Sequence, residues 1–302
     1  MATMDFAAIG KQIYDMRNPR ECRRYWVFRI RCALNRRNMK ALWDYFHSTP
    51  LLEKIAEQWP FVYEQPQRAF FYHRSTFADR AKLVEAHFAF LTARLREEVL
   101  LPLYCGKKLP LWNGPEMDGN PIALVISYEP GQRKEGLLSV MLRLANQPLY
   151  QIIFWFCPDR SGENSLWIGA MQGPNGDDAR EIVKKATKVC HAYRTKNLIL
   201  YATQAVARAL GVAHVYAVTN EGYYANNHLR VDKKLKTDFS EFWREAGGRP
   251  TEDSRFDELP LVEPRKTMEE VPTRKRAVYR RRFAMLDELD SAVETRIGEM
   301  MV

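Results

Sequence analysis

Four short runs of apolar residues lie between residues 122 and 171, and short turn-like segments separate them. They are rich in Val, Ile, Phe, Tyr and Trp, a composition typical of β-strands. The connections between them, such as EPGQRKEG and CPDRSGEN, favour an antiparallel meander because they are too short for a crossover. The runs are IALVISY from Ile122, LLSVMLRL from Leu137, LYQIIFWF from Leu149 and SLWIGAM from Ser165.

A helix and a further strand follow the meander. KNLILYATQAVARALG, from Lys196 to Gly211, predicts a helix with a glycine directly after its end, and AHVYAVT from Ala213 predicts a strand. A strand, a helical crossover and a strand imply a parallel pair joined to the meander. One mixed α/β domain therefore covers about 118 to 260.

The remainder of the chain is predicted to be mainly helical. We expect one amphipathic helix over about 21 to 46, further helices over 50–104, loops over 108–121 and a basic helix near the C-terminus. The predicted class is α+β, with an N-terminal helical region, a mixed antiparallel/parallel sheet with flanking helices, and a basic C-terminal helix. The predicted domains are 1–105, 106–262 and 263–302.

The composition is that of a globular protein. Of the 302 residues, 46% are hydrophobic, which is enough for a substantial core. We find no apolar run of signal-peptide length, so we expect a cytoplasmic location. The five cysteines are scattered, and Cys190 and His191 would point to different faces of a helix, so we predict no metal site.

The formal charge of +9 is concentrated in two segments. Residues 1–50 carry ten Lys and Arg against four Asp and Glu, and residues 263–282 carry eight against three. On the helix predicted over 21–46, arginines flank an apolar stripe that contains Trp26 and Ile30, as in helices that lie on membranes. We expect the anion- or membrane-binding residues to be Arg24, Arg29, Arg31, Arg36, Arg37, Arg274, Lys275, Arg276, Arg280, Arg281 and Arg282.

Two other interpretations of these segments stay open. An ordinary surface helix packed on the core would show a similar pattern, and Arg23 and Arg37 interrupt the apolar stripe. KRAVYRRRF interleaves cations with Tyr279 and Phe283, as nucleic-acid stacking surfaces do. We rank nucleic-acid binding below membrane docking, because no recognised nucleic-acid module accompanies this segment.

Six ordered blocks carry a resemblance to a known family. The blocks are KEGLLSVMLRL, LWIGAMQGPNG, Thr187-Lys188 with Arg194-Thr195-Lys196, ALGVAHVYAVTN, FSEFWREAGG and KRAVYRRRFAMLD. Through these blocks the chain resembles the VirK/YbjX family of Gram-negative bacteria from about Cys22 to Leu289. That family has no established reaction, but it is associated with virulence and with envelope properties that include tolerance of cationic antimicrobial peptides.

The α/β part is more remotely similar in architecture to the GCN5-related N-acetyltransferases. That similarity implies a thioester of coenzyme A or of acyl carrier protein, held near Gln172, Gly173 and Gly176 at the end of a strand. The residues of the loop themselves favour a plain structural turn, because Pro174 lacks an amide donor and the acidic pair that follows Gly176 repels phosphate. Arg194 and Lys196 are further candidates for an anionic arm.

The predicted catalytic residues are Asn220 and Tyr224, which follow the AHVYAVT strand and can supply an orienting amide and a phenolic acid. Tyr223 is the alternative to Tyr224 for the phenolic acid. Ordinary turn chemistry is the alternative for this stretch. His214 and His228 are candidate bases.

Two functional hypotheses follow. The first is an acyltransferase-like enzyme that acts on an envelope component. The second is a binding protein without chemistry, which docks on anionic lipid or on a protein partner and lies peripheral to the inner membrane. Residues 21–46 and 274–283 would then supply most of the membrane affinity.

Overall fold

One eight-stranded mixed sheet forms the centre of the molecule. The structure is a computed structural model, and it describes residues 4–226 and 238–302. The strand order is β1-β2-β3-β4-β5-β6-β8-β7. The meander and the α+β class are confirmed, and the parallel pair is β5 with β6. The predicted strands are β2 (Asn120–Ser127), β3 (Leu138–Leu144), β4 (Gln147–Pro158), β5 (Asn164–Gln172) and β6 (His214–Val218), and the sheet ends in β8 (Phe256–Leu259) and β7 (Arg249–Pro250).

The loops predicted over 108–121 were wrong, because residues Leu109–Met117 form strand β1 at the edge of the sheet. Asp118 and Gly119 have positive φ angles of 51° and 77°, which suit a two-residue hairpin turn into β2. The register shifts between Asn113 and Glu116, where Gly114 and Pro115 lie. An edge strand tolerates such residues because one side of it needs no partner.

The single helix predicted over 21–46 was also wrong. Residues Pro19–Leu34 form α2 and residues Arg36–Phe46 form α3. At Asn35, which lies between them, the backbone amide and the side-chain amide both donate to the Arg31 carbonyl, at 2.9 and 3.1 Å. Such local side-chain bonds compete with the regular helix ladder. The apolar stripe of α2 therefore ends at Leu34.

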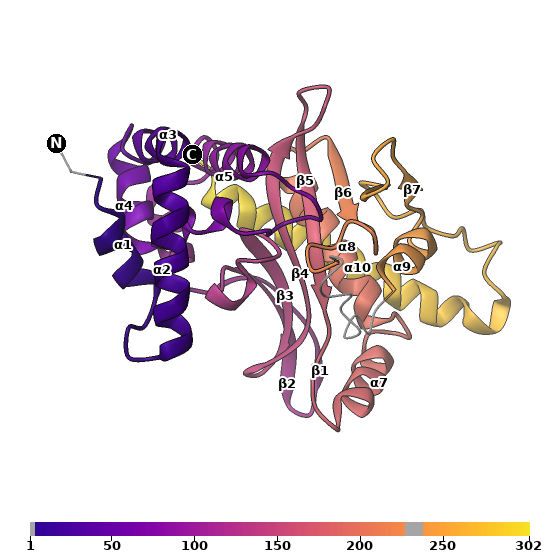
Figure 1. Ribbon diagram of the computed structural model, residues 1–302. Helices are drawn as coiled ribbons and strands as arrows, with labels where there is room; N and C mark the ends of the chain where they lie inside the picture. The colour runs from indigo at the N-terminus through magenta and orange to yellow at the C-terminus, as the bar shows by residue number, and fades with distance from the viewer. Residues whose placement is uncertain (1–3, 227–237) are drawn as a thin grey trace.

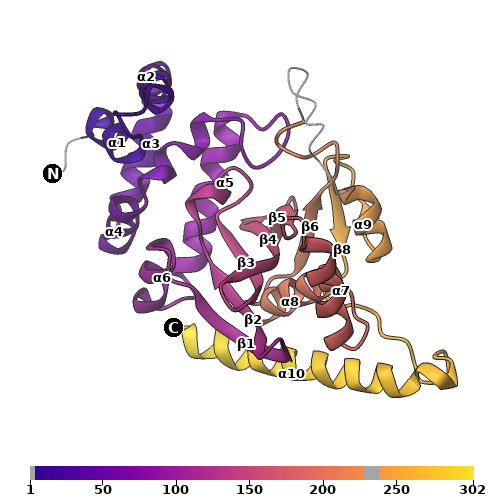
Figure 2. The same ribbon diagram turned by 90° about the horizontal axis from the view of Figure 1, so that it is seen from below.

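Further helices surround the sheet on both faces. In Figure 2, α5 lies on one side of the strands, and α8 and α10 lie on the other. Most of α8 is buried, because it packs between the sheet and α10. The helices are α1 (Phe6–Ile13), α4 (Pro50–Gln58), α5 (Phe77–Thr92), α6 (Glu97–Tyr104), α7 (Ala179–Val189), α8 (Thr195–Ala209), α9 (Phe239–Glu245) and α10 (Arg276–Met300), with short 3-10 turns η1 (Pro60–Tyr63), η2 (Gln65–Gln67), η3 (Pro130–Gln132) and η4 (Thr273–Lys275).

The two basic segments lie at opposite ends of the molecule. Figures 1 and 2 both place α2 in the helical group beside one end of the sheet, and the beginning of α10 at the far end. In the part of the chain that the structure describes, no helix is both long enough and apolar enough to cross a bilayer.

A buried carboxylate joins the N-terminal helices to the sheet. Glu64 is fully buried, and it accepts hydrogen bonds from the Tyr14 hydroxyl at 2.7 Å and from Arg68 Nη1 at 3.0 Å. Its other oxygen accepts from Arg133 Nε, at 2.8 Å, in the connection between β2 and β3. The charge of Glu64 is therefore shared by segments more than 60 residues apart.

Replacing Glu64 by Gln should lower the free energy of unfolding by about 3–5 kcal/mol, because two arginines would lose their buried counter-charge. Urea unfolding measures this difference. The matched control is Glu252→Gln, which changes a carboxylate that is 88% exposed and should stay within about 0.5 kcal/mol of the wild type. Equal stability of the two variants would contradict the role given to Glu64.

Candidate functional site

Helix α2 has two apolar faces, and the fold uses only one of them. Tyr25, Phe28 and Cys32 are buried against the rest of the N-terminal helices. The opposite side, which we call the α2 face, exposes 56% of Trp26, 58% of Ile30 and 80% of Leu34, together with Val27. Four of the seven strongly exposed large hydrophobic side chains among the described residues lie on this one helix. Such clustering is typical of an interaction surface.

A cavity of about 560 Å³ adjoins the α2 face, and arginines dominate its lining. Val27 belongs to both the cavity and the α2 face, so the apolar and cationic surfaces are continuous. Tyr14 and Glu64 also line this arginine cavity. Its cationic side chains are Arg20, Arg23, Arg24, Arg31 and Arg68.

The arginines predicted to bind anions differ in their engagement within the protein. Arg31 donates to the Gln67 carbonyl at 2.8 Å, and Arg29 donates to the Tyr25 hydroxyl at 3.0 Å. Arg24 pairs with Glu21 in the preceding turn. Arg36 and Arg37 are exposed at the beginning of α3.

The basic residues near the C-terminus are divided in the same way. Arg282 donates to the His191 and Ala192 carbonyls, and Arg276 donates to the Val271 carbonyl. These two arginines therefore help to hold α10 in place. The remaining predicted residues, Arg274, Lys275, Arg280 and Arg281, are exposed.

A second candidate site lies where β5 and β6 stop pairing. Their parallel register runs only from Ser165 and His214 to Ile168 and Ala217, whereas β5 continues to Gln172. Gly169 lies at a register shift between β4 and β5, and a Cβ there would lie 1.8 Å from the Glu135 carbonyl oxygen. Because Gly169 has no side chain, the backbone at Glu135 can pass directly over β5.

This crossing places the Glu135 carboxyl group between two neutral donors. Gln172 Nε2 donates to it at 2.6 Å, and the Tyr223 hydroxyl donates at 2.7 Å. Burial raises the pKa of Glu135, while the two hydrogen bonds oppose that shift. A carboxyl group held between two hydrogen-bond donors in a buried setting is a candidate for general acid–base chemistry. We call these three residues the Glu135 cluster.

The predicted catalytic residues lie close to this cluster but have other partners. The Asn220 side chain donates to Asp238 at 2.8 Å and accepts from the Phe239 amide at 2.9 Å, so its amide holds the beginning of α9. The Tyr224 ring packs on Phe70 and Tyr223. Catalytic roles for Asn220 and Tyr224 remain predictions, and His228 lies outside the described residues.

The predicted cofactor-binding residues with polar side chains contact two different acidic side chains, Glu135 and Glu245. Gln172 points to Glu135, whereas Arg194 and Lys196 approach the Glu245 carboxylate of α9, at 3.7 and 3.3 Å. A Cβ at Gly173 would lie 3.1 Å from the Tyr150 ring, and Gly176 has a φ of 134° two residues before the N-cap of α7. Binding of a thioester by these residues remains a prediction.

Comparison with known proteins assigns the family. A family model described as "Protein of unknown function (DUF535)" matches residues 17–295. The uncharacterized protein YbjX of Escherichia coli (strain K12) is 30% identical over 240 residues, which cover 76% of this chain and 72% of YbjX. The chain belongs to the VirK/YbjX family.

Two further relatives extend this assignment. An uncharacterized protein of Haemophilus influenzae is 27% identical to this VirK/YbjX-family chain over 294 residues, which cover 96% of the chain and 94% of the relative. LapB of Mannheimia haemolytica, which is named a membrane protein, is 26% identical over 187 residues, covering 61% of the chain and 77% of LapB.

Sequence reasoning missed Glu135 as a candidate site residue of this family member, and it offered Tyr223 only as the alternative to Tyr224. Glu135 is 37 residues from Gln172 and 88 residues from Tyr223. The one local signal is Gly136, where a Cβ would lie 2.7 Å from the Phe154 carbonyl oxygen, so the segment must approach the sheet closely.

Proposed function

We propose that this protein docks on anionic membrane surfaces through the α2 face, with the arginine cavity receiving lipid phosphate groups. The observation that carries the proposal is the exposure of Trp26, Ile30 and Leu34 beside a cavity lined by five arginines. A bilayer interface satisfies both surfaces at once, because it offers hydrocarbon for the apolar side chains and phosphates for the cations. The name of LapB supports the same placement.

The expected binding free energy is consistent with reversible docking on a membrane. Fully burying an aliphatic side chain contributes about 1.5–3 kcal/mol, and each Lys or Arg close to an anionic surface contributes about 1 kcal/mol. Three apolar side chains and a few arginines therefore supply enough for peripheral binding. We place the protein at the inner membrane of the cell envelope, on the cytoplasmic side.

The two basic segments have separate roles in this proposal. Because α2 and the beginning of α10 lie at opposite ends of the molecule, one flat bilayer would contact the α2 face without contacting the beginning of α10. We therefore assign the membrane affinity to the α2 end alone.

Sedimentation with vesicles of mixed phosphatidylcholine and phosphatidylglycerol tests the docking. Replacing Trp26, Ile30 and Leu34 together by Ser should weaken binding by about tenfold or more, because the inserted apolar surface is lost. Arg36→Glu with Arg37→Glu should weaken it similarly at low salt and less at high salt.

The matched control reverses four exposed cations at the other end of the molecule: Arg274, Lys275, Arg280 and Arg281. It should keep most of the vesicle binding. Docking through α2 is excluded if the triple Ser variant sediments with vesicles as the wild type does, or if the control loses binding to the same extent.

We infer acyl transfer as a second candidate function, carried by the Glu135 cluster. The antiparallel meander, the crossover through α7 and α8, and the short parallel pairing of β5 with β6 fit the order of elements in the GCN5-related acetyltransferases. In this proposal Glu135 accepts the proton of an acceptor hydroxyl or amine as that group attacks the thioester carbonyl. The bond between the acceptor and the acyl carbon forms, the carbon–sulfur bond breaks, and the proton passes from Glu135 to the departing thiolate.

Thermal shift with coenzyme A and with long-chain acyl-coenzyme A tests this second function. A ligand at 100 times its Kd stabilises the native state by about 2.7 kcal/mol, so the melting temperature should rise. Glu135→Gln should retain this shift but lose transfer to an added acceptor. A melting temperature that neither thioester nor free coenzyme changes would remove the acyltransferase proposal and leave membrane docking intact.

A further inference from the structure

A large cleft lies at the other end of the parallel pair, away from the Glu135 cluster. Its volume is about 1000 Å³, and residues of β4, β5, β6 and β8 line it together with α5. The rings of Trp167 and Tyr216 stack at 4.3 Å, and Trp155 lies parallel to Trp167 at 6.5 Å, so part of the cleft wall is aromatic. Charged side chains from the connection between β4 and β5 meet the beginning of β6 at its edge.

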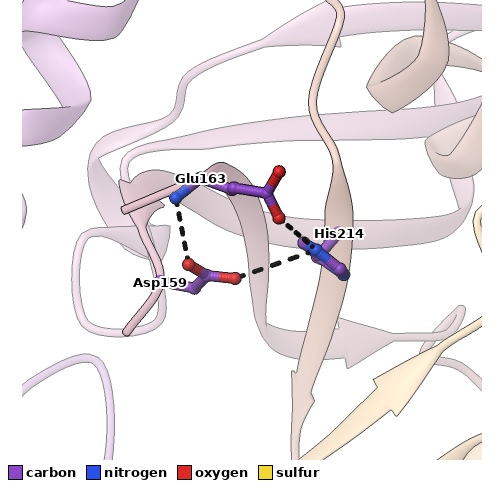
Figure 3. A group of neighbouring side chains, drawn as sticks. All are labelled: Asp159, Glu163 and His214. Carbon is purple, nitrogen blue, oxygen red and sulfur yellow. Dashed lines mark hydrogen bonds and ion pairs between the residues drawn. The ribbon is translucent and has the colours of Figure 1, made fainter. Parts of the chain in front are cut away.

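Three side chains at this edge converge on a single point. The ligand atoms of Asp159, Glu163 and His214 all lie within 4.8 Å of one another. His214 Nε2 lies 2.9 Å from Glu163 Oε2 and 3.9 Å from Asp159 Oδ2 (Figure 3). We call these residues the His214 cluster.

The surrounding structure fixes each member of the cluster. Glu258 Oε1 lies 2.8 Å from His214 Nδ1, so that nitrogen carries a hydrogen and Nε2 is turned towards Asp159 and Glu163. Asp159 Oδ1 accepts from the amides of Ser161 and Glu163, at 2.9 and 3.1 Å, which leaves Oδ2 directed to His214 and to the Tyr216 hydroxyl. A carboxylate behind the histidine is the usual support of a metal-binding imidazole.

We propose that Asp159, Glu163 and His214 bind a divalent transition-metal ion at the edge of this cleft. One imidazole nitrogen and two carboxylate oxygens form a mixed set that suits Zn²⁺ and Mn²⁺ better than Mg²⁺, which prefers oxygen alone. Three protein ligands leave coordination positions for a group bound in the cleft. Glu258 acts as a positioning residue that sets the tautomer of His214.

A metal ion would compete with protons for the imidazole of His214. Hydrogen bonds to Glu163 and Glu258 raise the pKa of His214. A ligating imidazole must be neutral, so metal binding releases a proton and weakens as the pH falls. The proposal departs from the sequence-based expectation of no metal, because Asp159 and His214 are 55 residues apart and share no motif.

Calorimetric titration of the full chain, first treated with a chelator, tests the site with Zn²⁺, Mn²⁺ and Mg²⁺ salts. We expect one strong site per chain, with affinity falling from Zn²⁺ to Mn²⁺ to Mg²⁺. His214→Gln and Glu163→Gln should weaken Zn²⁺ binding by about tenfold or more, and Glu258→Gln by about tenfold through the lost support. Melting curves without metal confirm that each variant folds.

Two control variants separate this site from surface binding. Glu252→Gln removes a carboxylate that also lines the cleft but lies outside the cluster, and His191→Gln removes another histidine. Both should bind Zn²⁺ as the wild type does. The proposal is overturned if the wild type binds none of the three ions, if His214→Gln binds Zn²⁺ unchanged, or if the signal disappears in His191→Gln instead.

Discussion

The buried Glu64 carboxylate is the interaction on which the position of the N-terminal helices depends. A fully buried charge persists only with paired and hydrogen-bonded partners, and Glu64 has them in Tyr14, Arg68 and Arg133. Tyr14 follows α1, on which α2 packs, so the network fixes the helix pair that presents the α2 face. Arg68 also lines the arginine cavity, where its charge is already shared with Glu64. The other four arginines of the cavity do not pair with Glu64, although Arg24 pairs with Glu21 and Arg31 donates to the Gln67 carbonyl.

The same N-terminal region reaches the Glu135 cluster. The Phe71 amide donates to the Lys134 carbonyl at 2.8 Å, and the His73 amide donates to the Gly222 carbonyl at 2.8 Å. Tyr72, between them, forms an isolated bridge with Tyr223 and packs its ring on Trp155. One short segment therefore contacts the residues beside Glu135 on one side and the aromatic wall of the cleft on the other. Residues 71–73 therefore connect the Glu135 cluster to the aromatic wall of the cleft.

Local sequence patterns predicted most strands of the sheet. The candidate sites could not be predicted in the same way, because they are formed by residues that are distant in the sequence. Runs of β-branched and aromatic residues indicated β2 to β5, and a glycine-terminated apolar helix indicated α8. The apolar stripe containing Trp26 and Ile30 was visible in sequence, but only the structure shows that no other helix among residues 4–226 and 238–302 covers it. The arginine pattern could not separate Arg282, which donates to carbonyls of the fold, from the exposed Arg281. The Glu135 and His214 clusters each join distant segments, so no spacing rule could find them.

The depth of Trp26 in the bilayer tests the proposed insertion of the α2 face most directly. Tryptophan fluorescence is measured on vesicles whose acyl chains carry bromine, a contact quencher, for the wild type and for Trp26→Phe, which keeps an aromatic ring at the position. Insertion predicts strong quenching in the wild type that is largely absent in Trp26→Phe, because Trp26 alone among the seven tryptophans lies on the α2 face. Equal quenching of the two proteins, or none in wild-type protein that is bound to the vesicles, would contradict the account.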